Sequence, residues 1–297
     1  MVILSKIELV KRIMIGEMLI NRNEKELVAQ CLLNPEKAED SFVEYFRKVA
    51  TDPKNFIERK MLIKEYIKQH FLDKTCEQIK AHIKNEFKNM ESLKNFRIKV
   101  VPPIFIDYVD PECLKTANYD LTLGEDVYVT TEKTPTKLTA MGKDGVVSVE
   151  PGEFGILMTN EYIFVPPDLM GFISIRLTHK QKGLVNISGF HADPGFYGRL
   201  MFAVFNAGPN YVPLRYKERV FMIMFNELAQ GESKVKKTRW SGMENIPVET
   251  LSGLRGTSVS VRNLDERIRR LEILFPILIT GVASVVVAIV TWLLTHW

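Results

Sequence analysis

The chain has 297 residues, a net charge of +4 at pH 7, 46% hydrophobic residues and 26% charged residues. This composition excludes a disordered chain, and a charge so mild and evenly spread gives no reason to expect nucleic acid as a partner. The three cysteines, Cys31, Cys76 and Cys113, form no CxxC pair. We therefore expect reduced thiols in a cytosolic compartment and no zinc site.

The N-terminal third of the sequence is helical in pattern. Residues 1–20 predict a short amphipathic helix with Ser5 as its N-cap. Residues 21–100 are rich in Lys, Glu, Leu and Ile at three- and four-residue spacing, and Pro35 and Pro53 separate the predicted helices. Charges alternate in sign along these helices, which is typical of a solvated face. We expect a helical module without chemistry of its own.

The residue pattern changes from helical to β-rich at about residue 101. About eight short runs rich in β-branched and aromatic residues follow, separated by Gly, Pro and Asn, with no helical pattern between them. Such a series predicts a mainly β domain, a sandwich or barrel, over residues 101–245. After Leu228 the pattern gives way to a basic, polar tail.

The C-terminal end predicts a membrane anchor. Residues 246–272 read as a linker and a short juxtamembrane helix, and residues 273–295 contain no charge. A helix of that length covers about 35 Å, enough to cross a hydrocarbon core of about 30 Å. Arginines before the span and Trp292 and Trp297 near its far end favour a single-pass anchor in membrane lipid, with the bulk of the chain cytoplasmic. Charges throughout residues 1–20 argue against a signal peptide.

Two loops of the β-rich part carry candidate site residues. The first, SIRLTHKQKGL, groups donors that suit a polyphosphate, although a solvated turn has the same composition. Its candidates are Arg176, Thr178, Lys180 and Lys182. The second, GFHADPGFYG, places His191 beside Asp193 in a turn held by Pro194 and Gly195. A carboxylate fixed there is able to orient a water or a sugar hydroxyl, although an ordinary turn also accounts for it.

The order of these pieces resembles the dCTP deaminase and dUTPase superfamily. The resemblance runs from about Tyr119 to Gly242, and residues 3–20 look like the family's opening helix, which makes 21–100 an insertion after that helix. The motifs that carry it are YDLTLG at 119–124, PGEFGILMTNEYIFVPPDLMGFISIRL at 151–177, ADPGFYGRL at 192–200 and a closing FMIMFNEL strand.

The resemblance implies a dUTPase-like distorted β-barrel of the β-clip or jelly-roll type. It implies a homotrimer whose sites are shared between subunits, a pyrimidine deoxynucleoside triphosphate as ligand, and Mg²⁺ on the triphosphate. It also implies deamination without zinc, which agrees with the lack of H-x-E and P-C-x-x-C ligand patterns in the sequence.

The resemblance also assigns roles to single residues. Arg176 and Thr178 match the family's phosphate loop, but Leu177 replaces a serine and Gln181 replaces a second arginine. Asp193 matches the aspartate that lies against the deoxyribose and, in dUTPases, positions the hydrolytic water. The tail RWSGMENIP looks like the segment that closes over the triphosphate: Trp240 and Gly242 match, Arg239 adds a cation, and Met243 stands where glutamine is usual.

The general base is the main departure from the family. In the deaminases a glutamate on the strand after the Asp193 turn activates water, and counting without a gap places Ala203 there. A methyl group transfers no proton, so we expect deamination to be lost. Apart from Asp193, the nearest alternative carboxylates are Glu218 and Glu227, which follow the next turn. Hydrolysis of a nucleotide through Asp193 stays open.

Three functions therefore remain. One is a membrane-tethered nucleotide-binding protein that no longer deaminates. The second is a nucleotide hydrolase of pyrimidine deoxynucleotide metabolism, dUTPase-like through Asp193 or a dCTP deaminase. The third is a structural trimerisation adaptor whose helical block, residues 21–100, recruits a protein partner.

Overall fold

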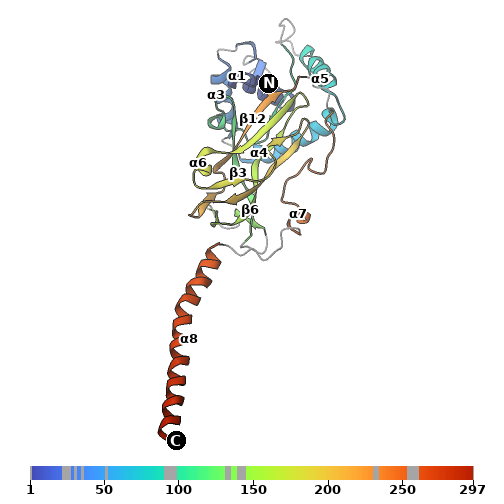
Figure 1. Cartoon of the computed structure of the whole chain (residues 1–297). Coiled ribbons are helices and arrows are strands. Elements are labelled where there is room, and N and C mark those ends of the chain that lie inside the picture. Colours follow the sequence, from blue (N-terminus) through green and yellow to red (C-terminus); the bar gives the residue numbers. More distant parts are fainter. Residues whose placement is uncertain are drawn as a thin grey trace.

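A computed structural model describes residues 2–21, 28–29, 32–34, 37–50, 53–89, 99–130, 135–138, 145–229, 234–252 and 261–296. Figure 1 shows a β body capped at one end by helices, with the long helix α8 (Val261–His296) leading away from it. The predicted fold class, mainly β with N-terminal helices and an apolar C-terminal helix, is confirmed.

The body is built from antiparallel strands. Within the described ranges, ten strands form one sheet with the path β8-β10-β6-β3-β12-β7-β9, to which β1, β2 and β4 add at the side, and β5 and β11 form a separate pair. The strands are β1 (Val2–Ile3), β2 (Phe105–Ile106), β3 (Tyr119–Val129), β4 (Thr136–Lys137), β5 (Val146–Val149), β6 (Phe154–Phe164), β7 (Leu169–Ile175), β8 (Leu184–Asn186), β9 (His191–Ala192), β10 (Tyr197–Asn206), β11 (Val212–Arg215) and β12 (Arg219–Glu227).

The sheet curls around an apolar core. Phe202 of β10 and Phe221 of β12 are fully buried and stack with ring centroids 4.1 Å apart. Two other strands, β6 and β3, lie between β10 and β12 along the sheet, so this contact crosses the interior of the curl. Burial alternates along β10, and the partly exposed positions, among them Ala203, lie on its outer face.

The opening helix α1 (Lys6–Ile20) begins as predicted, because Ser5 accepts a hydrogen bond from the backbone N–H of Glu8. It is not amphipathic, however: from Leu9 to Leu19 every residue except Lys11 is buried. The sheet covers one side, where Gly16 brings the helix against the carbonyl of Ile104, and the helical block covers the other. Both faces therefore need apolar or fully paired side chains.

The helical block comprises α3 (Ala38–Ala50), α4 (Pro53–Tyr66), a π-helix η2 (Ile67–Phe71) and α5 (Cys76–Lys88). The predicted break at Pro53 is the first residue of α4, the position where proline suits a helix start. Cys76 and Cys113 are buried free thiols, as expected, and Cys31 lies outside the described residues.

A buried charge pair joins this block to α1. The guanidinium of Arg59 on α4 binds both carboxylate oxygens of Glu17 and also donates to the backbone carbonyls of Ile106 and Asp107. The hydroxyl of Tyr45 donates to the same carboxylate at 3.2 Å. Both charges are buried, and each makes several hydrogen bonds. Removing either one would leave the other buried without a partner, so the pair holds the helical block on the barrel.

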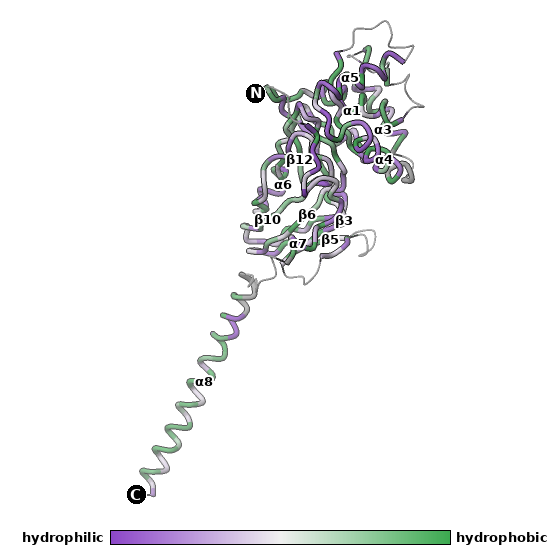
Figure 2. The backbone as a smooth tube through the Cα atoms, turned by 90° about the vertical axis from the view of Figure 1, so that its right-hand side faces the viewer, coloured by the Kyte–Doolittle hydropathy of each residue, from purple (hydrophilic) through white to green (hydrophobic). Residues whose placement is uncertain are grey.

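The C-terminal helix α8 is continuous, so the predicted juxtamembrane helix and membrane span form one element, with Pro276 inside it. Within Arg267–His296, the most apolar 18-residue window has a mean hydropathy of 2.8, and none of that window is buried against the described chain. Figure 2 shows the hydrophobic colour along most of α8. A helix of this length and composition is able to cross a membrane. Trp297 lies outside the described residues.

Candidate functional site

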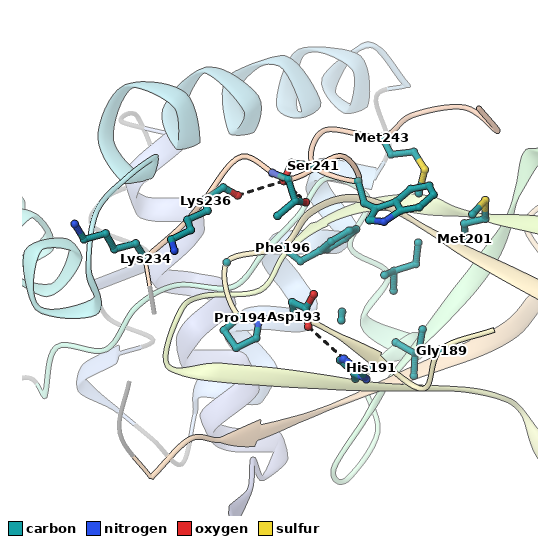
Figure 3. Close-up of a pocket in the computed structure, with 16 residues that line it drawn as sticks. Gly189, His191, Asp193, Pro194, Phe196, Met201, Lys234, Lys236, Ser241 and Met243 are labelled. Carbon is teal, nitrogen blue, oxygen red and sulfur yellow. Dashed lines mark hydrogen bonds and ion pairs between the residues drawn. The ribbon is translucent and has the colours of Figure 1, made fainter. Parts of the chain in front are cut away.

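A cavity of about 630 Å³ lies between the turn that carries Asp193 and the segment 234–243, which follows the sheet in sequence (Figure 3). We call residues 234–244 the closing segment. The cavity wall on the barrel side comes from the turn 189–196, from Leu200 and Met201 on β10 and from Ile173 on β7. The opposite wall is the closing segment, which contributes Lys234, Lys236, Thr238, Trp240, Ser241 and Met243.

His191 and Asp193 face the cavity together. His191 lies on the short edge strand β9, and its Nε2 is 3.2 Å from Oδ1 of Asp193. The turn between them and β10 is closed by the backbone, because Phe196 N donates to the carbonyl of Asp193 at 3.0 Å. The Asp193 side chain is 74% exposed. Its carboxylate is therefore held in place on one side and open to a ligand on the other.

Two glycines let the closing segment lie against this turn. Gly195 has φ +82°, and a Cβ on it would lie 3.0 Å from the Cα of Val235. Gly198 has φ +144°, and a Cβ there would lie 3.0 Å from the backbone nitrogen of Met243. Any larger residue would both strain the backbone and push the closing segment away. The glycines of DPGFYG thus serve the contact with the closing segment.

The closing segment is tied to β10 by backbone hydrogen bonds. Gly242 N donates to Tyr197 O at 2.7 Å, and Arg199 N donates to Met243 O at 2.8 Å. Trp240 is 40% exposed and lines the cavity, with the guanidinium of Arg239 5.0 Å from its ring centroid. Of the predicted tail residues, Trp240 reaches the cavity, whereas Arg239 and Gly242 are not among the residues that line it.

The predicted phosphate loop does not line this cavity. It forms the one-turn helix α6 (Leu177–Lys180), whose N-cap Arg176 donates to the carbonyl of Arg219 and lies 3.3 Å from Asp120. Lys180 donates to Ser174 at 2.7 Å. Among the described residues that line the cavity, none comes from this loop, so Arg176, Thr178, Lys180 and Lys182 do not meet Asp193 within a single chain.

Ala203 lies on the outer face of β10. It is opposite Ile156 on β6, which is opposite Tyr128 on β3. Ile156 and Tyr128 belong to a small apolar cluster that Ile246 and Leu251, beyond the closing segment, cover. Ala203 is not one of the residues that line the cavity, although Met201, two residues earlier on the same face, is.

The two alternative carboxylates that follow Ala203 in sequence, Glu218 and Glu227, bind other partners. Glu218 accepts a hydrogen bond from Arg215 N at 2.8 Å and lies 3.6 Å from His179, whose pKa is lowered by burial. Glu227 lies 3.6 Å from Arg12. The structure therefore brings neither of them to Ala203.

Sequence reasoning missed the contacts of the closing segment with the helical block. Glu244 pairs with Lys60 and Lys64 on α4, and Val235 bonds to the turn after η2. The alternating charges of this block predict a solvated face, and no local pattern links the two lysines to a glutamate 184 and 180 positions away. Within the described ranges, no three His, Cys, Asp or Glu side chains gather as metal ligands do.

The chain is similar to known dCTP deaminases. Residues 97–228 match a family model described as dCTP deaminase-like. The chain is 31% identical over 148 residues to a dCTP deaminase of Pyrococcus abyssi, a match that covers 50% of this chain and 92% of that protein. It is 34% identical over 130 residues to the dCTP deaminase of Pyrococcus furiosus, covering 44% and 80%.

Two solved structures are similar to part of the chain. The 2'-deoxycytidine 5'-triphosphate deaminase from Agrobacterium tumefaciens aligns with a TM-score of 0.34 at 15% identity, over 40% of this chain and 42% of that one. The dUTPase of EIAV aligns with a TM-score of 0.27 at 15% identity, over 40% of this chain and 92% of that one.

Proposed function

Because the chain belongs to the dCTP deaminase-like family, we propose that it is a membrane-tethered protein that binds a pyrimidine deoxynucleoside triphosphate without deaminating it. The observation that carries this proposal is the cavity that Asp193, Trp240 and two lysines of the closing segment line together. Its volume of about 630 Å³ suits a small organic ligand, since such sites measure about 300–1,000 Å³.

The lining groups match the parts of a nucleotide. The Asp193 carboxylate accepts a hydrogen bond from a sugar hydroxyl, and the Trp240 ring offers a face for a base. Lys234 and Lys236 supply ammonium groups for phosphate oxygens. Mg²⁺ would enter with the triphosphate and offset its charge, which fits a wall that offers cations and no cluster of acidic ligands among the described residues.

The absence of deamination rests on Ala203. Attack on the base needs a group that takes a proton from water, and that help is worth about 10²–10⁴-fold in rate. In the family resemblance this group falls on Ala203, whose neighbours across the sheet are Ile156 and Tyr128. Neither an aliphatic side chain nor a phenol hydroxyl takes the place of a carboxylate as base.

The site is proposed to be completed in a homotrimer. The donors of the α6 loop are outside the cavity of one chain, so a neighbouring copy would have to bring them to the triphosphate. A self-association surface is available on the outer face of β8 and β10, where Val185, Ile187 and Phe205 are exposed. Large apolar side chains grouped on a surface favour contact with another protein surface.

A second candidate, a dUTPase-like hydrolase, is favoured by the pair of His191 and Asp193. With its carboxylate 3.2 Å from an imidazole nitrogen and open to solvent, Asp193 is placed to hold a water molecule. Hydrolysis of the triphosphate would then need no group at position 203.

Calorimetry separates these functions. The full chain in detergent is titrated with dCTP, dUTP and dTTP in the presence of Mg²⁺, and each mixture is then chromatographed. We expect heat of binding and no conversion of dCTP to dUTP. Release of pyrophosphate from dUTP would identify the hydrolase instead, and no binding of any of the three would leave the trimerisation adaptor.

The membrane tether has its own test. We expect the full chain to sediment with membranes and to need detergent for release, and a chain ending at residue 260 to remain in the supernatant. A full chain that is released by salt or high pH alone would contradict insertion of α8 into the bilayer.

A further inference from the structure

The closing segment is held at its first end by the helical block. The turn that follows η2 exchanges two backbone hydrogen bonds with Val235: Asp73 N donates to Val235 O at 2.8 Å, and Val235 N donates to Lys74 O at 3.1 Å. The side chain of Val235 is fully buried. These two hydrogen bonds join residues that are about 160 positions apart in the sequence.

The second end is held by charge. The carboxylate of Glu244 accepts from Nζ of Lys60 at 3.0 Å and from Nζ of Lys64, one helical turn further along α4. All three side chains are partly buried, and burial lowers the pKa of both lysines. Two partly buried cations on one carboxylate make a stronger contact than an exposed surface pair, because solvent screens it less.

The same segment forms a wall of the cavity on its other side. Between the two anchor points, Lys236, Thr238 and Trp240 line the cavity. Val235 also abuts Gly195 in the turn that carries Asp193. A continuous path of contacts therefore runs from the turn after η2, through Val235, to the Asp193 turn.

The turn after η2 is shaped for this contact. Asp73 has φ +61°, a left-handed conformation that a residue other than glycine adopts at a cost. In that conformation its backbone N–H points to Val235 O. The hydrogen bond to the closing segment is therefore made from a backbone conformation that is itself unfavourable.

We propose that the helical block is a positioning element of the pocket, which holds the closing segment against the Asp193 turn whether or not a ligand is bound. The effect on nucleotide rests on the proposed function, whereas the clamp itself does not. A wall that is already in place loses little conformational entropy when a ligand binds. Any protein or ligand that moves α4 or η2 would therefore change the affinity of the pocket.

Trypsin tests the clamp without a nucleotide, because the closing segment contains Lys234, Lys236, Lys237 and Arg239. In the full chain in detergent, we expect Lys60→Gln/Lys64→Gln to raise the rate of cleavage at these sites by roughly tenfold, since proteolysis of a closed segment tracks its open population. Mass spectrometry assigns the cuts. Glu244→Gln should have the same effect.

Two controls make the result specific. Lys60→Arg/Lys64→Arg keeps both charges and should preserve protection. Lys80→Gln removes a lysine paired with Glu77 on the exposed side of α5 and should leave the rate unchanged. Trp240 is the only tryptophan before residue 292, so quenching of its fluorescence by acrylamide in a chain that also carries Trp292→Phe and Trp297→Phe gives a second readout.

Titration with dUTP then measures the effect on the pocket. We expect Lys60→Gln/Lys64→Gln to weaken binding of dUTP by roughly fivefold or more, through loss of the preorganised wall. An unchanged trypsin rate in both the lysine variant and Glu244→Gln would overturn the inference. Failure of the wild type to bind dUTP would overturn the proposed function and leave the clamp to be decided by the trypsin result.

Discussion

Ala203 of β10 lies directly opposite Ile156 of β6, and this pair stands on the outer face of the barrel beside the cavity. Met201, one step along the same face, lines the cavity wall. The position at which the family resemblance expects a proton-transferring carboxylate is therefore near the pocket but surrounded by apolar side chains. A substitution at position 203 is therefore the most direct test of whether the pocket can still support deamination.

We expect Ala203→Glu to gain deamination of dCTP, at least tenfold above the wild type, because general-base help is worth about 10²–10⁴-fold. Chromatography of dCTP and dUTP after incubation with the full chain measures it. Ala203→Gln is the matched control, since it has the same shape and takes no proton. If Ala203→Glu binds dCTP and stays inactive, the geometry for water has been lost as well as the glutamate.

We expect Asp193→Asn to weaken binding of dCTP and dUTP by roughly tenfold, because the amide lacks the charge that strengthens a hydrogen bond from a sugar hydroxyl. Calorimetry measures the affinity. The Asp193 side chain is mostly exposed, so the free energy of unfolding should change by less than about 0.5 kcal/mol. Glu77→Gln, on the exposed face of α5, serves as control. Equal affinities for all three proteins would remove Asp193 from the site.

Glu161 of β6 makes stability depend on pH. Its buried carboxylate accepts hydrogen bonds from Thr122 N and Oγ1, yet burial outweighs these bonds and raises the pKa to about 8. The folded chain thus keeps a proton that the unfolded chain releases near the ordinary value of 4.5. The free energy of unfolding therefore falls as pH rises between these two values and levels off above the folded one.

We expect Glu161→Gln to remove this decline, because the amide oxygen still accepts from Thr122 and carries no charge. Burial also raises the pKa of Asp107 to about 6, so a comparison above pH 6 isolates Glu161. From about pH 6 to pH 8 the wild type should lose on the order of 2 kcal/mol more than the variant, at about 1.36 kcal/mol per pKa unit. Urea unfolding at the two pH values tests this, and parallel losses in both proteins would contradict it.

The pair of Arg59 and Glu17 predicts a non-additive effect on stability. Arg59→Met leaves the Glu17 carboxylate buried without its partner, and such a change costs about 3–5 kcal/mol. The double variant Arg59→Met/Glu17→Met removes both charges and should recover most of that loss. Urea unfolding followed by circular dichroism measures the wild type, Arg59→Met, Glu17→Met and the double variant. Additive costs of the two single changes would mean that the charges stabilise the fold independently.

Some of the fold and site could be predicted from the sequence because the signals are local. Ser5 caps α1 through a bond three residues away, and the Pro-Gly after Asp193 places the carboxylate in a turn. The burial of α1 on all sides could not be predicted in this way. An amphipathic helix packs on one surface, whereas α1 packs between the sheet and the helical block. Trp240 was expected beside a ligand from the family resemblance alone, and the structure places it on the cavity wall.

Local sequence patterns are enough to predict a mainly β chain with N-terminal helices, a long apolar C-terminal helix, and a turn that carries Asp193. Periodicity and turn-forming residues act over a few positions, so they can be recognised in the sequence alone. Folding of the whole chain is needed to place the closing segment between that turn and the helical block, and the α6 loop outside the cavity. The contacts with the Asp193 turn join residues about 40 positions apart, and those with the helical block join residues about 160 to 184 positions apart. Their stability comes from packing and paired charge that exist only once the chain has folded.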